Sequence, residues 1–126
     1  MAYTTINKSS DFFNTKLYTG TGSSNDVTGV GFQPDLVWLK KRNAADNHYW
    51  FDAVRGATKY IRSNLTSAEA TDSGSLSAFG SDGFTVVSEG DINANGATMA
   101  SWNWKAGTGQ GSSNTDGSIN TAYTSA

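Results

Sequence analysis

The side chains that could do acid–base or metal chemistry in this chain are a single histidine, His48, and eleven carboxylates. Two suitably spaced carboxylates could hydrolyse a glycosidic bond. The numerical candidates are Asp52, Asp72, Asp82, Glu89 and Asp91. No spacing in the sequence pairs any two of them. One histidine excludes a metal site built from several histidines of a single chain, and a catalytic triad would have to be built entirely around it.

Other catalytic patterns are missing or incomplete in the sequence. No GxSxG elbow marks a serine nucleophile, and GTGQGSS lacks the preceding strand and following helix of a phosphate-binding loop. The aspartates fall mostly in turn-like segments, which leaves calcium bound by loop oxygens open, although no EF-hand spacing supports it. We assign no catalytic, cofactor-binding or metal-binding residue and predict that the protein is not an enzyme.

Aromatic side chains are the remaining candidates, because exposed aromatic residues bind sugars and dock proteins. In a small β domain most aromatic residues belong to the core. Trp50 alternates with Tyr49 and Phe51, so one of these faces is expected to point toward a second layer, a subunit interface or a ligand. The predicted glycan or interface contacts are Tyr49, Trp50, Phe51, Lys41 and Arg42, the last two from the basic end of a neighbouring strand.

The elements that must position these side chains are short strands. The chain has 14 glycines, one proline and 12% aromatic residues, a composition typical of strands joined by many turns. A length of 126 residues allows one core, and without cysteine that core must hold by packing and hydrogen bonds. We predict an all-β fold, a jelly-roll-like antiparallel β-sandwich with at most one short helical turn and a Gly/Ser-rich C-terminal extension.

Alternation of apolar and polar residues predicts the strands. Pro34 marks the entry to the strand 35–42, which is apolar on both faces and is therefore expected to be central. In 98–107, the clearest case, the tryptophans and the polar residues lie on opposite sides. Further strands are expected within 12–18, 27–32, 48–56, 55–64, 73–79 and 84–90.

Two segments depart from the strand pattern. Thr66 and Glu69 have the spacing of a capping box, which predicts one helical turn over 66–70. After Lys105 the composition turns to Gly, Ser, Thr and Asn, which can bury little apolar surface. We predict a sandwich domain at 1–106 and a flexible linker or partner-docking tail at 107–126, either joining this module to more chain or reaching a neighbouring subunit.

Charge and hydropathy limit the partners. The formal net charge of -2 gives no basic excess for binding nucleic acid, and no apolar run approaches the roughly 18 residues that a membrane span needs. The N-terminal residues lack the pattern of a secretion signal. We expect no nucleic-acid partner, no membrane span, no cofactor and synthesis in a cytoplasm.

Four segments carry a resemblance to a known family: GFQPDLVWLKKR, FDAVRGATKYIRSN, FGSDGFTV and ASWNWKAG. In this order they resemble a β-rich domain that recurs in tail fibres and other virion-attached proteins of tailed bacteriophages, especially marine phages. The resemblance covers residues 12 to about 107. It carries no catalytic motif, so it assigns no residue a catalytic role.

The resemblance implies a virion structural protein, a tail-fibre or adhesin module that takes part in particle assembly and host attachment. It implies a homo-oligomer, with a trimer favoured, in contact with other virion proteins and located in the virion. A capsid decoration protein is an alternative within this class. A lectin-like carbohydrate-binding sandwich that recognises a host surface glycan is the second hypothesis, and a glycan-degrading enzyme is the third.

Overall fold

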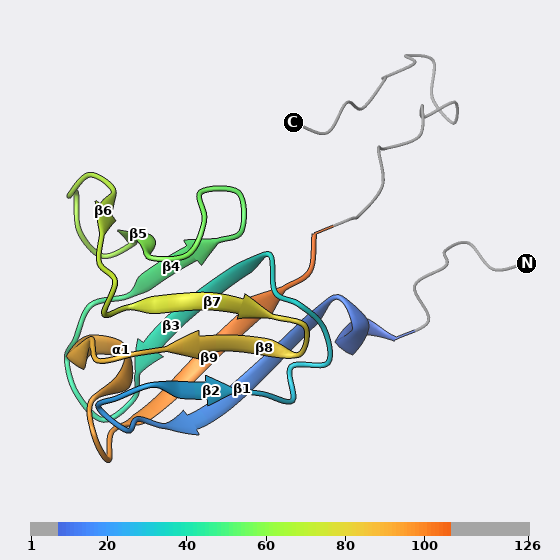
Figure 1. The fold of residues 1–126 in the computed structure, drawn as a ribbon, viewed down its shortest axis with the longest axis horizontal. Helices are drawn as coiled ribbons and strands as arrows, with labels where there is room; N and C mark the ends of the chain where they lie inside the picture. The colour runs from blue at the N-terminus through green and yellow to red at the C-terminus, as the bar shows by residue number, and fades with distance from the viewer. Residues whose placement is uncertain (1–7, 107–126) are drawn as a thin grey trace, which may run out of the picture.

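The computed structural model describes residues 8–106, which form two antiparallel sheets packed face to face (Figure 1). The large sheet has the strand order β1 (Phe13–Thr19), β9 (Thr98–Trp104), β3 (Leu36–Lys41), β4 (Tyr49–Asp52), β5 (Lys59–Arg62) and β6 (Ala70–Thr71). The small sheet has the order β2 (Asn25–Val27), β8 (Gly83–Val86) and β7 (Leu76–Gly80). The predicted all-β antiparallel sandwich is confirmed.

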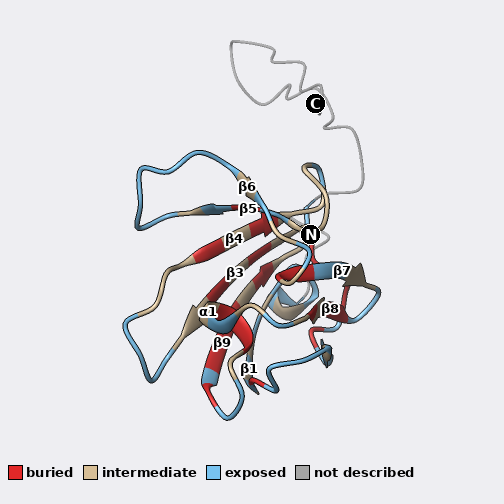
Figure 2. Ribbon diagram, turned by 60° about the vertical axis from the view of Figure 1, so that its left-hand side comes forward, coloured by how far each residue is buried: buried red, intermediate tan, exposed pale blue. Residues whose placement is uncertain are grey.

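The core lies between the two sheets. The inner face of β3, β4 and β9 supplies fully buried residues, among them Leu39, Phe51 and Met99. They pack against Val27, Phe84 and other residues of the small sheet. Figure 2 shows this burial as red segments along β3, β4 and β9. Because each strand alternates, the residues between these core positions must point away from the small sheet.

The strand after Pro34 is central, as the sequence predicted. β3 pairs with β9 on one side and with β4 on the other. Pro34 precedes the strand, where its missing N–H removes no ladder bond. The next residue, Asp35, fixes the entry, since its N–H donates to the Trp104 carbonyl and its own carbonyl accepts from the Ala53 N–H.

Helical structure lies elsewhere than expected. The helical turn predicted over 66–70 is wrong, because this stretch leads without helix into β6, whose two residues pair with β5. The described residues instead form a 3-10 turn, η1 (Ser9–Asp11), and one short helix, α1 (Gly90–Asn93). Glu89 caps α1 by accepting a hydrogen bond from the Asp91 N–H. The apolar piece expected at 27–32 forms a strand only up to Val27.

Buried polar side chains join segments that are distant in sequence. Asn93 is fully buried. Its Oδ1 accepts from the Thr21 N–H and from the Asn25 side chain at 3.1 Å each, while its Nδ2 donates to the Ser23 and Val87 carbonyls. This side chain therefore ties the loop between β1 and β2 to the segment that enters α1.

No helix among residues 8–106 has the length and apolar character needed to cross a membrane. The tail predicted at 107–126 lies outside the described residues.

Candidate functional site

The carboxylates considered for catalysis take part in local hydrogen bonds. Asp52 binds Arg55 through the Arg55 backbone N–H and guanidinium. Burial alone would raise the pKa of Asp52, but these bonds to Arg55 bring it below its ordinary value. Asp72 accepts from the Gly74 N–H, and Asp91 accepts from the Asn47 amide. In the part of the chain described, no three His, Asp or Glu side chains gather where they could hold a metal ion.

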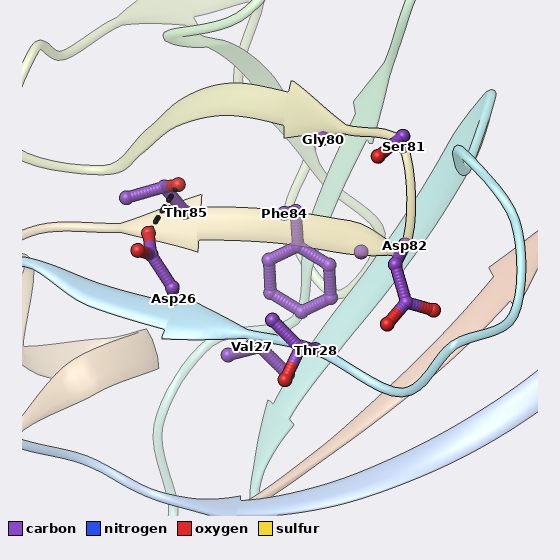
Figure 3. A pocket seen from close by; sticks show the side chains of 9 residues that line it. Asp26, Val27, Thr28, Gly80, Ser81, Asp82, Phe84 and Thr85 are labelled. Atoms are coloured by element: carbon purple, nitrogen blue, oxygen red, sulfur yellow. Dashed lines mark hydrogen bonds between the residues drawn. The ribbon is translucent and has the colours of Figure 1, made fainter.

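One shallow pocket of about 270 Å³ lies between β2 and the hairpin that joins β7 to β8 (Figure 3). It contains two carboxylates, Asp26 and Asp82. Asp26 accepts a 2.7 Å hydrogen bond from the Thr85 hydroxyl, and Asp82 accepts from the backbone N–H groups of Gly29 at 2.9 Å and Gly31 at 2.6 Å. These N–H groups hold the pKa of Asp82 below its ordinary value. Both carboxylates therefore fix the position of the hairpin.

The basic end of β3 is largely occupied by internal contacts. The Lys40 ammonium donates to the carbonyls of Lys41, Ala44 and Asp46 at 2.8 to 3.1 Å, which closes the loop after the strand. Lys41 forms an ion pair with Asp46. Of the two basic residues predicted to make contacts, only Arg42 has an exposed side chain.

Tyr49 and Phe51 are not surface contacts, which corrects the sequence prediction. Both are fully buried between the sheets. The Tyr49 hydroxyl accepts a 2.6 Å hydrogen bond from Arg62, whose guanidinium lies 4.9 Å from the Tyr49 ring centroid. Burial raises the pKa of Tyr49. Trp50, between them in sequence, points to the opposite side of the sheet. The predicted alternation of faces is therefore correct, whereas the predicted surface contacts at Tyr49 and Phe51 are wrong.

All four tryptophans of the chain lie on the outer face of the large sheet, directed away from the core. The register places Trp38 opposite Trp50 on one side and Trp102 on the other. We call the outward-pointing apolar residues of this sheet the tryptophan face. They are Phe13, Leu17, Leu36, Trp38, Trp50, Ile61, Trp102 and Trp104.

The tryptophan rings stack on one another across the strands. Trp38 and Trp50 have ring centroids 5.3 Å apart with planes at 25°, and Trp38 and Trp102 are 4.8 Å apart at 34°. Trp38 therefore packs between the tryptophans of the two neighbouring strands. Trp104 extends the array, with its ring centroid 6.2 Å from Trp50 and 5.1 Å from Phe13.

The indole N–H groups at the centre of this array are buried, and its margins are exposed. The indole Nε1 atoms of Trp38 and Trp50 are buried and have no hydrogen-bond partner in 8–106. At the margins, Phe13 is 39% exposed, Ile61 is 42% exposed and Leu17 is 61% exposed. No strand or helix of the described range forms a further layer over this face (Figure 1). Within residues 8–106 the outer face of the large sheet is thus an ordered aromatic surface.

Comparison with known proteins places the chain in a family. A family described as Domain of unknown function (DUF7483) matches residues 8–126. The chain belongs to this family. No curated protein and no solved structure matches it.

In this member of the DUF7483 family, the sequence pattern predicted only part of the tryptophan face. Alternation correctly placed Trp102 and Trp104 on the same side of β9. It gave no reason to expect that side to be the outer one, because the inner side carries Ser101 and Asn103, both fully buried. Asn103 donates to the Asn14 carbonyl and to the Ser101 hydroxyl at 3.0 Å each. Internal hydrogen bonds of this kind let polar residues take the core positions.

Proposed function

We propose that this DUF7483 chain is a non-enzymatic structural module of a bacteriophage particle, within a tail fibre or another virion-attached protein. In this role it joins other virion subunits through its tryptophan face and takes part in assembly and host attachment. Two lines of support meet here. The four quoted segments resemble a domain of such proteins, and no strand or helix of residues 8–106 covers the apolar outer face of the large sheet.

The tryptophan face is the observation that carries the proposal. Contiguous exposed apolar patches mark interaction sites on folded proteins, and tryptophan is enriched among the residues that contribute most to binding. Stacking also fixes the rings before a partner arrives, so little side-chain freedom is lost on contact. A polar margin adjoins this face at Asp52 and Arg55, where an ion pair continues to Glu69. An apolar centre with a polar rim is the common anatomy of a protein–protein interface.

A sugar-binding platform is the second candidate, and the ring geometry favours it less. Stacking on a sugar needs an aromatic ring with one free face. Trp38 packs between two neighbouring tryptophans, and its buried indole N–H cannot reach a sugar hydroxyl.

Light scattering on the purified chain, combined with a glycan array, separates the two functions. We expect an oligomer, with three copies favoured by the resemblance, and no glycan binding. Trp50→Ala should weaken self-association while the fold survives, because this residue projects from the outer face. A monomer that binds a glycan and loses it in the Trp50→Ala variant would support the lectin function and overturn the assembly role.

Phe51→Ala serves as the matched comparison, because residue 51 is the next position on the same strand and faces the core. We expect it to lower the free energy of unfolding by about 4 kcal/mol. Trp50→Ala should lower it less, by about 2–3 kcal/mol, because the half-buried ring loses stacking and part of its buried area. Electron microscopy of particles labelled at the C-terminus of the chain then places the module on the tail fibre or, for a decoration protein, on the head.

A further inference from the structure

The two sheets have four edges among the described residues, and only one of them is long and regular. β6 has two residues, β2 has three, and β7 carries a register shift between Leu76 and Ala78. Short length, bulges and inward-pointing charges are the usual protections of an edge strand, and β1 has only the last of these, at Lys16. β1 has seven residues that pair in unbroken register with β9 and contain no proline (Figure 1). It is therefore the edge most open to another strand.

The register shows which backbone groups of β1 point outward. The Lys105 N–H donates to the Phe12 carbonyl and the Gly20 N–H donates to the Ala97 carbonyl, each at 2.8 Å. These two bonds show that the even-numbered residues of this strand are the ones that exchange backbone hydrogen bonds with β9. The odd-numbered residues, from Phe13 onward, therefore exchange no backbone bonds with β9. The N–H and C=O groups of Phe13, Thr15 and Leu17 consequently project from the edge, without a backbone partner in residues 8–106.

We propose that a second copy of this chain pairs with this edge, β1 against β1, in antiparallel register about a two-fold axis at Thr15. In this register Thr15 lies opposite the partner's Thr15, and Phe13 lies opposite the partner's Leu17. All three positions are hydrogen-bonding positions on both strands, so the outward groups of one copy satisfy those of the other. A two-fold contact of this type uses the same patch on both copies and closes on itself.

The side chains of β1 are complementary to themselves in this register. On the outer face, an aromatic ring meets an aliphatic chain at each end, a favourable cross-strand pair, and two threonines meet at the centre. Phe13 and Leu17 are the residues of the tryptophan face that the single chain leaves exposed next to this edge. On the inner face, Lys16 lies opposite the partner's Asn14, so the one charge of the strand does not meet its own copy.

The pair would also double the surface proposed above for assembly. The ring of Phe13 contacts Trp104, so pairing at this edge joins the two tryptophan arrays into one continuous surface. This inference concerns a different contact from the tryptophan face and does not depend on what covers that face. It predicts an even number of copies: a dimer, or a hexamer where the trimer favoured by the resemblance also forms.

A charge exchange at the two-fold axis tests the register directly. Thr15 is exposed and its side chain points away from the core. The variants Thr15→Lys and Thr15→Glu should therefore both fold. Each alone places like charges directly opposite across the axis, and we expect its pairing to weaken roughly tenfold or more. An equimolar mixture of the two should regain the wild-type mass, twice the 13.3 kDa of one chain for a simple dimer.

The matched controls are Thr98→Lys and Thr98→Glu, on the same outer face but on β9, one strand inside the edge. They should leave the mass unchanged. Amide exchange at Thr15 and Leu17 should be slow in the assembled wild type and fast in either charged variant alone. A wild-type monomer or trimer, a mixture no heavier than its components, or amides already protected in a monomer would each overturn the pairing. A trimer would overturn the pairing of the two edges but would still be consistent with the proposed assembly role.

Discussion

Asn93 is a single buried side chain that joins the loop between β1 and β2 to the segment entering α1. Replacing it with alanine removes the partners of the Thr21 N–H and of the Ser23 and Val87 carbonyls. We expect Asn93→Ala to lower the free energy of unfolding by about 3 kcal/mol, because buried polar groups are left without partners. Urea denaturation measures the change. Asn95→Ala, two residues away and exposed, should stay within about 0.5 kcal/mol of wild type, and equal losses in both variants would contradict the role given to Asn93.

Asp82 gives the fold a dependence on pH. The backbone N–H groups of Gly29 and Gly31, with Lys16 nearby, hold the pKa of its carboxyl below the ordinary value of 3.8. The stabilising contribution is therefore complete above the unfolded pKa and is lost as the pH falls through the lower folded pKa. In Asp82→Asn, stability should be lower at neutral pH and should fall less on acidification.

Urea unfolding of the wild type and of Asp82→Asn from about pH 5 to about pH 2.5 covers the range in which the folded and unfolded carboxyls titrate differently. Asp11→Asn is the control, because no hydrogen bond to the Asp11 carboxylate occurs in 8–106. Parallel pH profiles for wild type and Asp82→Asn would show that the carboxylate does not hold the hairpin.

At the level of elements, the β7–β8 hairpin depends on a close backbone contact with β2. A Cβ at Gly83 would lie 1.9 Å from the Val27 carbonyl oxygen, and Gly83 has a φ of +153°. We expect Gly83→Ala to cost at least about 2 kcal/mol, from strain and displacement of β2. Gly90→Ala, where nothing lies within 4 Å, should change the free energy of unfolding by less than about 1 kcal/mol. Thermal melts of the two variants compare them, and similar stabilities would rule out the contact as a constraint.

The strands themselves could be predicted from sequence, whereas the direction of their faces could not. Alternation of residue types with a period of two identifies β3, β4 and β9, because this pattern is local in the sequence. Which side is the core depends on the other sheet. Alternation separates Trp102 from Asn103 without saying which side is buried, and hydrogen bonds allow Asn103 to take the core side. The capping-box spacing of Thr66 and Glu69 failed for a similar reason, since pairing of the next residues with β5 keeps this stretch out of a helix.

For the whole molecule, the central claim is that the tryptophan face is a contact surface. Every tryptophan of the chain lies on it, so intrinsic tryptophan fluorescence reports on this face alone. The decisive measurement is the tryptophan emission maximum and its quenching by acrylamide, followed over a concentration series alongside the mass from light scattering. If the face joins subunits, emission should shift to shorter wavelength and quenching should fall as the mass rises. A rise in mass with unchanged emission and quenching would contradict the claim.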